Sequence, residues 1–218
     1  MVKLTHHMQK YKLYLFDFDG TLVDSHHSLE DVFYGAYKAI GVTIDKTNTP
    51  RYARQPLEVT SKEVNAPDDP KSIEIFISEI RRLLDDKEVL KKTRLYPETL
   101  EVLKYFNDNN IPVGIVTSNN AGHVKDVLDF FDIAHDTFSI YVDSDEIRET
   151  KPSPKPILRA LEKFGPIDLK DVCYVGDALN DALAAERAHV TPILLDRDNS
   201  YPSEKKYIKI VDLRDLIK

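Results

Sequence analysis

The sequence predicts an α/β protein: a parallel sheet covered by helices on both faces, with a helical insertion early in the chain. Short apolar runs rich in branched and aromatic residues alternate with segments whose apolar residues recur at helical spacing. Strands that alternate with helices in this way form parallel sheets. The insertion is predicted by a third observation. Asp17 and Thr117, which follow the first two runs, lie 100 residues apart, whereas a strand–helix–strand unit needs only about 30 residues.

Five apolar runs are the expected strands. The first, Leu13–Phe16, ends directly before Asp17 and Asp19, as a buried strand does where it enters a polar loop. The other four are Ile111–Val116, Thr137–Val142, Val172–Val175 and Pro192–Leu195. Together with the helices between them, these runs predict a Rossmann-like core in three layers.

The helices between the later strands are expected at Pro97–Phe106, Gly122–Phe131, Pro154–Phe164 and Asn180–Ala188. The stretch from residue 25 to residue 94 has helical patterns throughout. One helix begins near Ser28 and ends before Gly41, and another carries apolar residues at the periodic positions Ile73, Phe76, Ile77, Ile80, Leu83 and Leu84. We therefore expect a helical subdomain over residues 25–94, hinged near residues 23–25 and 95–96. The core would be formed by residues 1–24 and 95–218.

Composition excludes several classes of protein. Thirty basic and 37 acidic residues give a net charge of −7, which is unlike the basic surface of a nucleic-acid-binding protein. No apolar run approaches the roughly 18 to 20 residues of a membrane span. The single Cys173 cannot form an internal disulfide, and the first ten residues are too polar for a signal peptide. We expect a cytoplasmic protein that needs neither a nucleic acid nor a membrane as partner, and the sequence leaves its oligomeric state open.

Polar residues gather where the expected strands end. They are Asp17 and Asp19 after the first strand, Thr117 and Ser118 after the second, Lys151 after the third, and Asp177 and Asp181 after the fourth. Ligands of open parallel sheets bind outside the carboxyl ends of the strands. Four crowded carboxylates repel one another unless a cation lies among them, and an all-oxygen set of ligands favours Mg²⁺.

A phosphate monoester is the substrate that such a site would accept, because its charge needs several positive partners. Asp17 would attack the phosphorus and form an aspartyl-phosphate, which water then cleaves. Asp19, two residues further on, would protonate the leaving oxygen and later deprotonate the water. We expect the neighbouring carboxylates to raise the pKa of Asp19 enough for this role.

Four motifs in order resemble those of the haloacid dehalogenase superfamily. They are LFDFDGTLVDS at residues 15–25, GIVTSN with Thr117, TKPSP with Lys151, and YVGDALND with Asp177 and Asp181. The chain is identified as a member of this superfamily, in the branch that resembles phosphoglycolate phosphatase and β-phosphoglucomutase. An aspartate at position 19 is typical of its phosphatases and phosphomutases, whereas the dehalogenases carry a bulky aromatic residue there.

The resemblance implies a role for each of these residues. The metal would be held by Asp17, the backbone carbonyl of Asp19, and Asp177, while Asp181 would act through water or orient its neighbours. Lys151 would hold the phosphate and the nucleophile together. Backbone amides of the turn formed by Asp19, Gly20 and Thr21, and the Ser118 amide after Thr117, would add contacts to the phosphate. The helical insertion would be a mobile cap that closes over the site, excludes water and selects the substrate.

Two positions depart from the family pattern. In the segment YARQPLEVTSKEV, Arg54 replaces a glycine that is usual in the phosphoglycolate phosphatase-like members, so we expect Arg54 or Gln55 to reach the closed site. The helix of the fourth motif ends in Ala188-His189 instead of Ala-Gly. If His189 is left-handed, it costs up to about 1 kcal/mol relative to glycine.

The sequence also allows other functions. A phosphomutase or a pyrophosphatase would use the same Asp17 chemistry. A phosphoacceptor switch also combines an acidic pocket, a threonine or serine and a lysine, but a long insertion after the first strand fits that module poorly. A silent binding protein is disfavoured because every motif residue is present.

Overall fold

The computed structural model describes residues 10–49, 52, 57–84 and 86–218. Within them a six-stranded sheet has the order β5-β4-β1-β6-β7-β8, and every neighbouring pair is parallel. The strands are β1 (Leu13–Phe16), β4 (Val113–Val116), β5 (Ile140–Val142), β6 (Val172–Gly176), β7 (Thr191–Leu195) and β8 (Ile208–Ile210). Phe16 of β1 is level with Ile115 of β4 and Val175 of β6. The three central strands therefore end at the same edge of the sheet.

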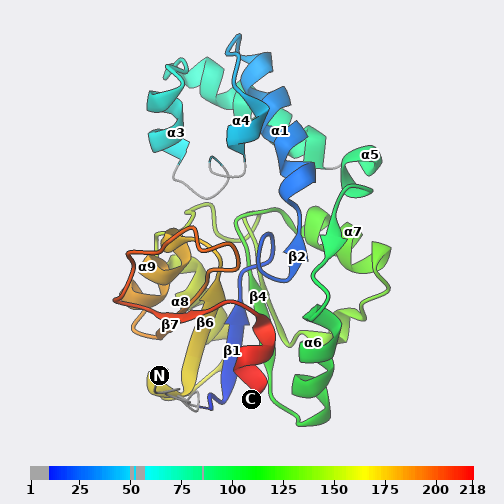
Figure 1. Cartoon of the computed structure of the whole chain (residues 1–218), viewed down its shortest axis with the longest axis vertical. Helices are drawn as coiled ribbons and strands as arrows, with labels where there is room; N and C mark the ends of the chain where they lie inside the picture. Colours follow the sequence, from blue (N-terminus) through cyan, green and yellow to red (C-terminus); the bar gives the residue numbers. More distant parts are fainter. Residues whose placement is uncertain (1–9, 50–51, 53–56, 85) are drawn as a thin grey trace.

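Helices cover both faces of this sheet, as the sequence predicts, and give three layers (Figure 1). On one face lie α6 (Thr99–Asp108), α7 (Ala121–Phe130) and the C-terminal 3-10 helix η4 (Leu213–Ile217). On the other lie α8 (Lys155–Phe164) and α9 (Leu179–Arg187). Among the described residues, no helix has both the length and the apolar composition required to cross a bilayer.

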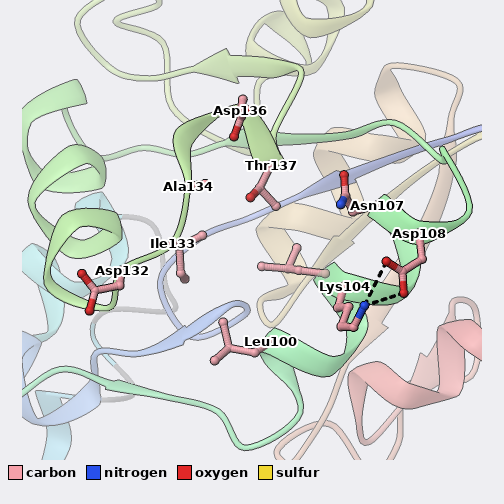
Figure 2. Close-up of a pocket in the computed structure, with 10 residues that line it drawn as sticks. Leu100, Lys104, Asn107, Asp108, Asp132, Ile133, Ala134, Asp136 and Thr137 are labelled. Atoms are coloured by element: carbon pink, nitrogen blue, oxygen red, sulfur yellow. Dashed lines mark hydrogen bonds and ion pairs between the residues drawn. The ribbon is translucent and has the colours of Figure 1, made fainter.

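A polar cavity of about 380 Å³ lies between α6 and the segment that follows α7 (Figure 2). Its lining is acidic, with Asp108, Asp132 and Asp136, and Lys104 at its edge is already paired with Asp108. None of the residues that the sequence singles out for chemistry lines this cavity.

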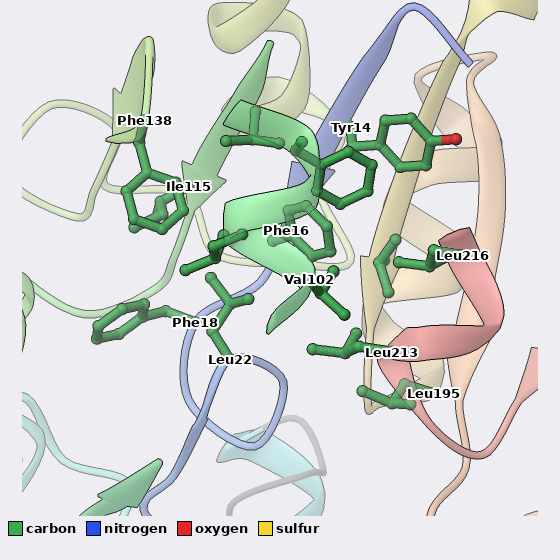
Figure 3. Close-up of a cluster of buried hydrophobic side chains, with 14 of the residues drawn as sticks. Tyr14, Phe16, Phe18, Leu22, Val102, Ile115, Phe138, Leu195, Leu213 and Leu216 are labelled. Carbon is green, nitrogen blue, oxygen red and sulfur yellow. The ribbon is translucent and has the colours of Figure 1, made fainter. Parts of the chain in front are cut away.

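Alternating side chains of the strands divide the core between the two faces. Tyr14 and Phe16 of β1 point into a cluster with α6, α7 and η4, whereas Leu13 and Leu15 point into a cluster with α8 and α9. Figure 3 shows the first cluster, in which Phe16 lies among Val102, Leu213 and other buried side chains. Cys173 of β6 is fully buried, as expected for a residue of a core strand.

Every regular element described between β2 (Val23–Asp24) and β3 (Arg94–Leu95) is a helix. They are α1 (His26–Ala39), η1 (Lys46–Asn48), α3 (Leu57–Glu63), α4 (Pro70–Leu84) and α5 (Lys87–Leu90). Helix α1 packs against α4, and this group has a buried cluster of its own that includes Tyr37 and Phe76. Figure 1 shows the group beyond the edge at which the sheet strands end. Because β2 pairs with β3 in antiparallel fashion, the chain passes from the sheet to this group of helices and back again at one place.

Candidate active site

Asp17 stands at the end of β1, the central strand of the site, and its amide donates to the carbonyl of Val175 on β6 at 2.9 Å. The carboxylate is buried, and Oδ2 accepts a hydrogen bond from the Thr21 hydroxyl at 3.3 Å. Two strands and the turn after β1 therefore fix the orientation of this side chain.

Two glycines leave room beside the backbone for the carboxylates of Asp177 and Asp181. Gly20 has a φ of +81°, and a Cβ there would lie 2.6 Å from Oδ2 of Asp177. A Cβ on Gly176 would lie 2.3 Å from Cγ of Asp181. A side chain at either position would displace the neighbouring carboxylate, because real Cβ atoms do not come so close to other heavy atoms.

Lys151 provides the positive charge of the site. Its Nζ lies 2.5 Å from Oδ1 of Asp17 and 2.6 Å from Oδ1 of Asp181, and it donates to the Tyr174 hydroxyl at 3.0 Å. The Tyr174 hydroxyl in turn donates to the carbonyl of Val116 at 2.9 Å. Burial alone would lower the pKa of Lys151, but Asp17 and Asp181 more than offset this effect and raise it well above its ordinary value. The ammonium therefore keeps its charge although it is buried.

The carboxylates of Asp17, Asp177 and Asp181 fit a divalent cation. One oxygen from each lies within 4.8 Å of the others, and all three residues are buried. Burial raises the pKa of Asp17, the Lys151 charge lowers it, and the charges of Asp181 and Asp177 raise it again, so that it lies well above its ordinary value. A further positive charge would relieve this repulsion, and an all-oxygen set suits a hard cation.

The carboxylate of Asp19 does not join this group, contrary to the expected crowding of four carboxylates. Its Oδ2 accepts a hydrogen bond from Asn119 Nδ2 at 2.5 Å, and its Oδ1 lies 3.1 Å from His123 Nε2. Burial would raise the pKa of Asp19, but the charge and hydrogen bond of His123 and the hydrogen bond of Asn119 outweigh it and lower the pKa. The expectation that neighbouring carboxylates raise this pKa is therefore wrong, because the Asp19 side chain faces donors instead.

The remaining predicted residues lie in different places. The backbone amides of Gly20 and Thr21, which were expected to contact the phosphate, donate instead to the carbonyls of Val23 at 2.8 Å and Phe18 at 3.3 Å, so that expectation is wrong. Thr117 is buried, and its amide donates to the carbonyl of Val142 at 2.9 Å, which holds the end of β4 against β5. Ser118 follows on the exposed surface of the same loop. Arg54 and Gln55 lie outside the described residues. His189 has a φ of 60°, so the left-handed conformation considered for this position is present.

Four residues at the site were not predicted to have a role, although Asn119 and Tyr174 lie within the segments GIVTSN and YVGDALND. Asn119 and His123 contact Asp19, and Tyr174 contacts Lys151. Arg197, just after β7, donates to the carbonyls of Gly20 and Thr21, forms an ion pair with Glu98 at 2.5 Å, and stacks 3.6 Å above the Tyr96 ring. No pattern in the sequence pairs Asn119 or His123 with Asp19, because Asn119 precedes helix α7 whereas His123 lies in its first turn.

Known proteins resemble this chain over most of its length. The family of haloacid dehalogenase-like hydrolases matches residues 14–195. Phosphoglycolate phosphatase of Photorhabdus laumondii is 30% identical over 177 residues, covering 79% of this chain and 75% of that protein. Phosphoglycolate phosphatase of Escherichia coli K12 is 30% identical over 194 residues, covering 79% of this chain and 76% of its own.

Solved structures show the same fold. A Bacteroides fragilis protein described as a haloacid dehalogenase-like hydrolase has a TM-score of 0.80 at 25% identity, covering 92% of this chain and 96% of its own. A HAD phosphatase from Thermococcus onnurineus has a TM-score of 0.67 at 22% identity, covering 95% of this chain and 96% of its own. The chain belongs to the haloacid dehalogenase-like hydrolases, in the phosphoglycolate phosphatase-like branch of phosphoric monoester hydrolases.

Proposed function

We propose that this chain is a Mg²⁺-dependent phosphatase that hydrolyses a small phosphomonoester through an aspartyl-phosphate on Asp17. One observation carries the proposal: Asp17 is buried at the end of β1, within hydrogen-bond distance of Lys151 and beside the carboxylates of Asp177 and Asp181. The relatives named phosphoglycolate phosphatase support a small anionic substrate.

Asp17, the backbone carbonyl of Asp19, and Asp177 would hold the magnesium ion. When bound, the ion supplies positive charge that offsets the charge of the phosphoryl oxygens. Asp181 accepts hydrogen bonds from Lys151 and from the amide of Ala178 at 3.0 Å, so it keeps Lys151 and the start of α9 in place. Magnesium, rather than a softer metal, is favoured because every donor is oxygen.

The chain's own residues carry both chemical steps. An oxygen of Asp17 attacks the phosphorus, and the bond between phosphorus and the leaving oxygen breaks as Asp19 gives that oxygen a proton. A water molecule then attacks the phosphorus of the aspartyl-phosphate, gives its proton to Asp19 and releases free Asp17 and inorganic phosphate. Lys151, the Thr117 hydroxyl and the backbone amide of Ser118 hold the phosphoryl oxygens. Asp19 must take up a proton when the substrate binds, and a negative phosphate nearby favours that uptake.

The helices of residues 25–94 form the cap in this proposal, and residues 1–24 and 95–218 form the core. The paired strands β2 and β3 are the hinge, because they are the point at which the chain passes from one to the other. Closure of the cap excludes water from the aspartyl-phosphate until the leaving group has departed. Arg54 or Gln55 would then contact a second anionic group of the substrate.

A phosphate-release screen tests this function. The purified protein with Mg²⁺ is given a panel that includes phosphoglycolate, sugar phosphates and pyrophosphate, beside the Asp17→Asn variant. We expect release from one or a few small monoesters, no release after chelation of the metal, and no release by Asp17→Asn. Conversion of a hexose 1-phosphate to its 6-phosphate without release would show a phosphomutase instead. A phospho-aspartate that persists for minutes with no turnover would show a phosphoacceptor switch.

A further inference from the structure

Both oxygens of the Asp19 carboxylate are held by one short segment of the chain. Asn119 Nδ2 donates to Oδ2 at 2.5 Å, and His123 Nε2 lies 3.1 Å from Oδ1. Since an ionised carboxylate only accepts hydrogen bonds, the imidazole N–H is the donor. The side chains of His123 and Asp19 are only 4% and 10% exposed, so water competes little for either contact.

The segment that carries these donors is itself fixed. The His123 amide donates to Oδ1 of Asn120 at 2.8 Å, which caps the start of α7. The backbone carbonyl of Asn119 accepts a hydrogen bond from the backbone amide of Ser144 at 3.0 Å. The backbone amide of Asn119 donates a hydrogen bond to Oγ1 of Thr117 at 3.1 Å. The Phe18 ring lies edge-on to the imidazole at a centroid distance of 6.2 Å. The side chains of Asn119 and His123 therefore extend from a loop and a helix end that are held in place by these contacts.

We propose that His123, together with Asn119, positions the Asp19 carboxylate for its proton transfers; this inference rests on the proposed phosphatase function. His123 is a positioning residue and acts only through Asp19. The segment after β4 then has two tasks. Its Thr117 faces the phosphate, while Asn119 and His123 aim the acid–base group at the leaving oxygen.

A role through Asp19 makes the importance of His123 depend on the leaving group. An alkoxide is a poor leaving group and must receive a proton from Asp19 as its bond to phosphorus breaks. A p-nitrophenolate ion leaves without a proton. A residue that only stabilises the fold, or that holds phosphate, would affect both substrates alike.

Two variants of His123 separate these possibilities. His123→Phe keeps an aromatic ring against Phe18 but removes the donor, whereas His123→Gln can place an amide nitrogen near the position of Nε2. Values of kcat and KM are measured for phosphoglycolate, or another alkyl phosphate that the unchanged enzyme hydrolyses, and for p-nitrophenyl phosphate. For His123→Phe we expect kcat on the alkyl ester to fall roughly ten- to hundredfold, within the range of acid–base effects, with KM nearly unchanged. Release of p-nitrophenolate in a single turnover, which precedes the water step that also uses Asp19, should change less than about threefold, and His123→Gln should recover most of the lost kcat.

Equal losses on both substrates in the single-turnover rate of leaving-group release, no loss, or a Gln variant as poor as the Phe variant would overturn the proposal. A crystal structure of His123→Phe gives a readout besides activity. The Asp19 carboxylate should turn away from its present position, and an unchanged orientation of this carboxylate would contradict the proposal. Should His123→Phe fail to fold, Asn119→Ala removes the other donor from a half-buried loop position and is judged by the same leaving-group criterion. If the unchanged enzyme releases phosphate normally, these failures concern His123 alone. If it hydrolyses no monoester, the proposed function fails and this role fails with it.

Discussion

At the scale of single residues, the site depends on the absence of side chains as much as on their presence. Gly20 and Gly176 are the positions at which the backbone passes close to Asp177 and Asp181. The carboxylates, Thr117 and Lys151 could be predicted from the sequence because they follow strands in recognisable motifs. Asn119 and His123 could not, because their contacts with Asp19 span 100 and 104 residues and arise only when β1 and β4 pair.

Gly20→Ala should impair both stability and catalysis. Gly41 offers a matched control, since its φ of +78° is nearly the same as the +81° of Gly20, but a Cβ added at Gly41 would meet no described atom within 4 Å. Gly41→Ala should lower the free energy of unfolding by about 1 kcal/mol and leave kcat unchanged. Gly20→Ala should lower it more and abolish most phosphate release, because the added methyl group displaces Asp177. Chemical denaturation and the phosphate-release assay measure both effects, and equal behaviour of the two variants would contradict the role given to Gly20.

His189→Gly should stabilise the protein without changing its activity. His189 is exposed and left-handed, with a φ of 60°, and glycine adopts this conformation without a steric penalty. We expect a gain of about 0.5–1 kcal/mol in the free energy of unfolding. His189→Ala keeps the penalty and serves as the control, so a similar gain in both variants would point to loss of the imidazole as the cause.

At the scale of elements, long buried strands and periodic helices were predictable, and short or exposed ones were not. The five predicted strands and four predicted core helices are present, with ends that differ by a few residues. Strand β8 was not predicted, because Ile208 and Lys209 are both exposed and its sequence lacks the alternation of buried and exposed side chains. Only its pairing with β7 identifies it as a strand. The two-residue strands β2 and β3 are likewise defined by their mutual pairing.

Arg197 joins three elements, and its loss should weaken all of their contacts. It links the end of β7 to the turn after β1 and to Glu98 at the start of α6. Glu98 is only 4% exposed, so Arg197→Met leaves a buried charge without its partner. We expect a loss of about 3–5 kcal/mol in the free energy of unfolding, with partial recovery in the Arg197→Met/Glu98→Gln double variant. A loss below about 1 kcal/mol in denaturant titrations would show that solvent already screens this pair.

At the scale of the whole molecule, binding of a cation to the native state should stabilise the fold. The three carboxylates gather only when the sheet is formed, so we expect Mg²⁺ to bind the folded chain more tightly than the unfolded one. Stability should rise with Mg²⁺ concentration and gain about 2.7 kcal/mol at a hundred times the dissociation constant. Thermal unfolding scans test this, with Asp177→Asn expected to lose the dependence and Asp132→Asn, in the cavity beside α6, expected to keep it. A dependence that survives Asp177→Asn would place the ion elsewhere.

The central claim is that Asp17 carries the phosphoryl group during turnover. The most direct measurement is to quench the enzyme with acid while it turns over its substrate, digest it, and locate the phosphoryl group by peptide mass spectrometry. We predict a phosphoryl group on Asp17 in the unchanged enzyme and none in Asp17→Asn. A phosphoryl group on another residue, or steady phosphate release by the Asp17→Asn variant, would contradict the account.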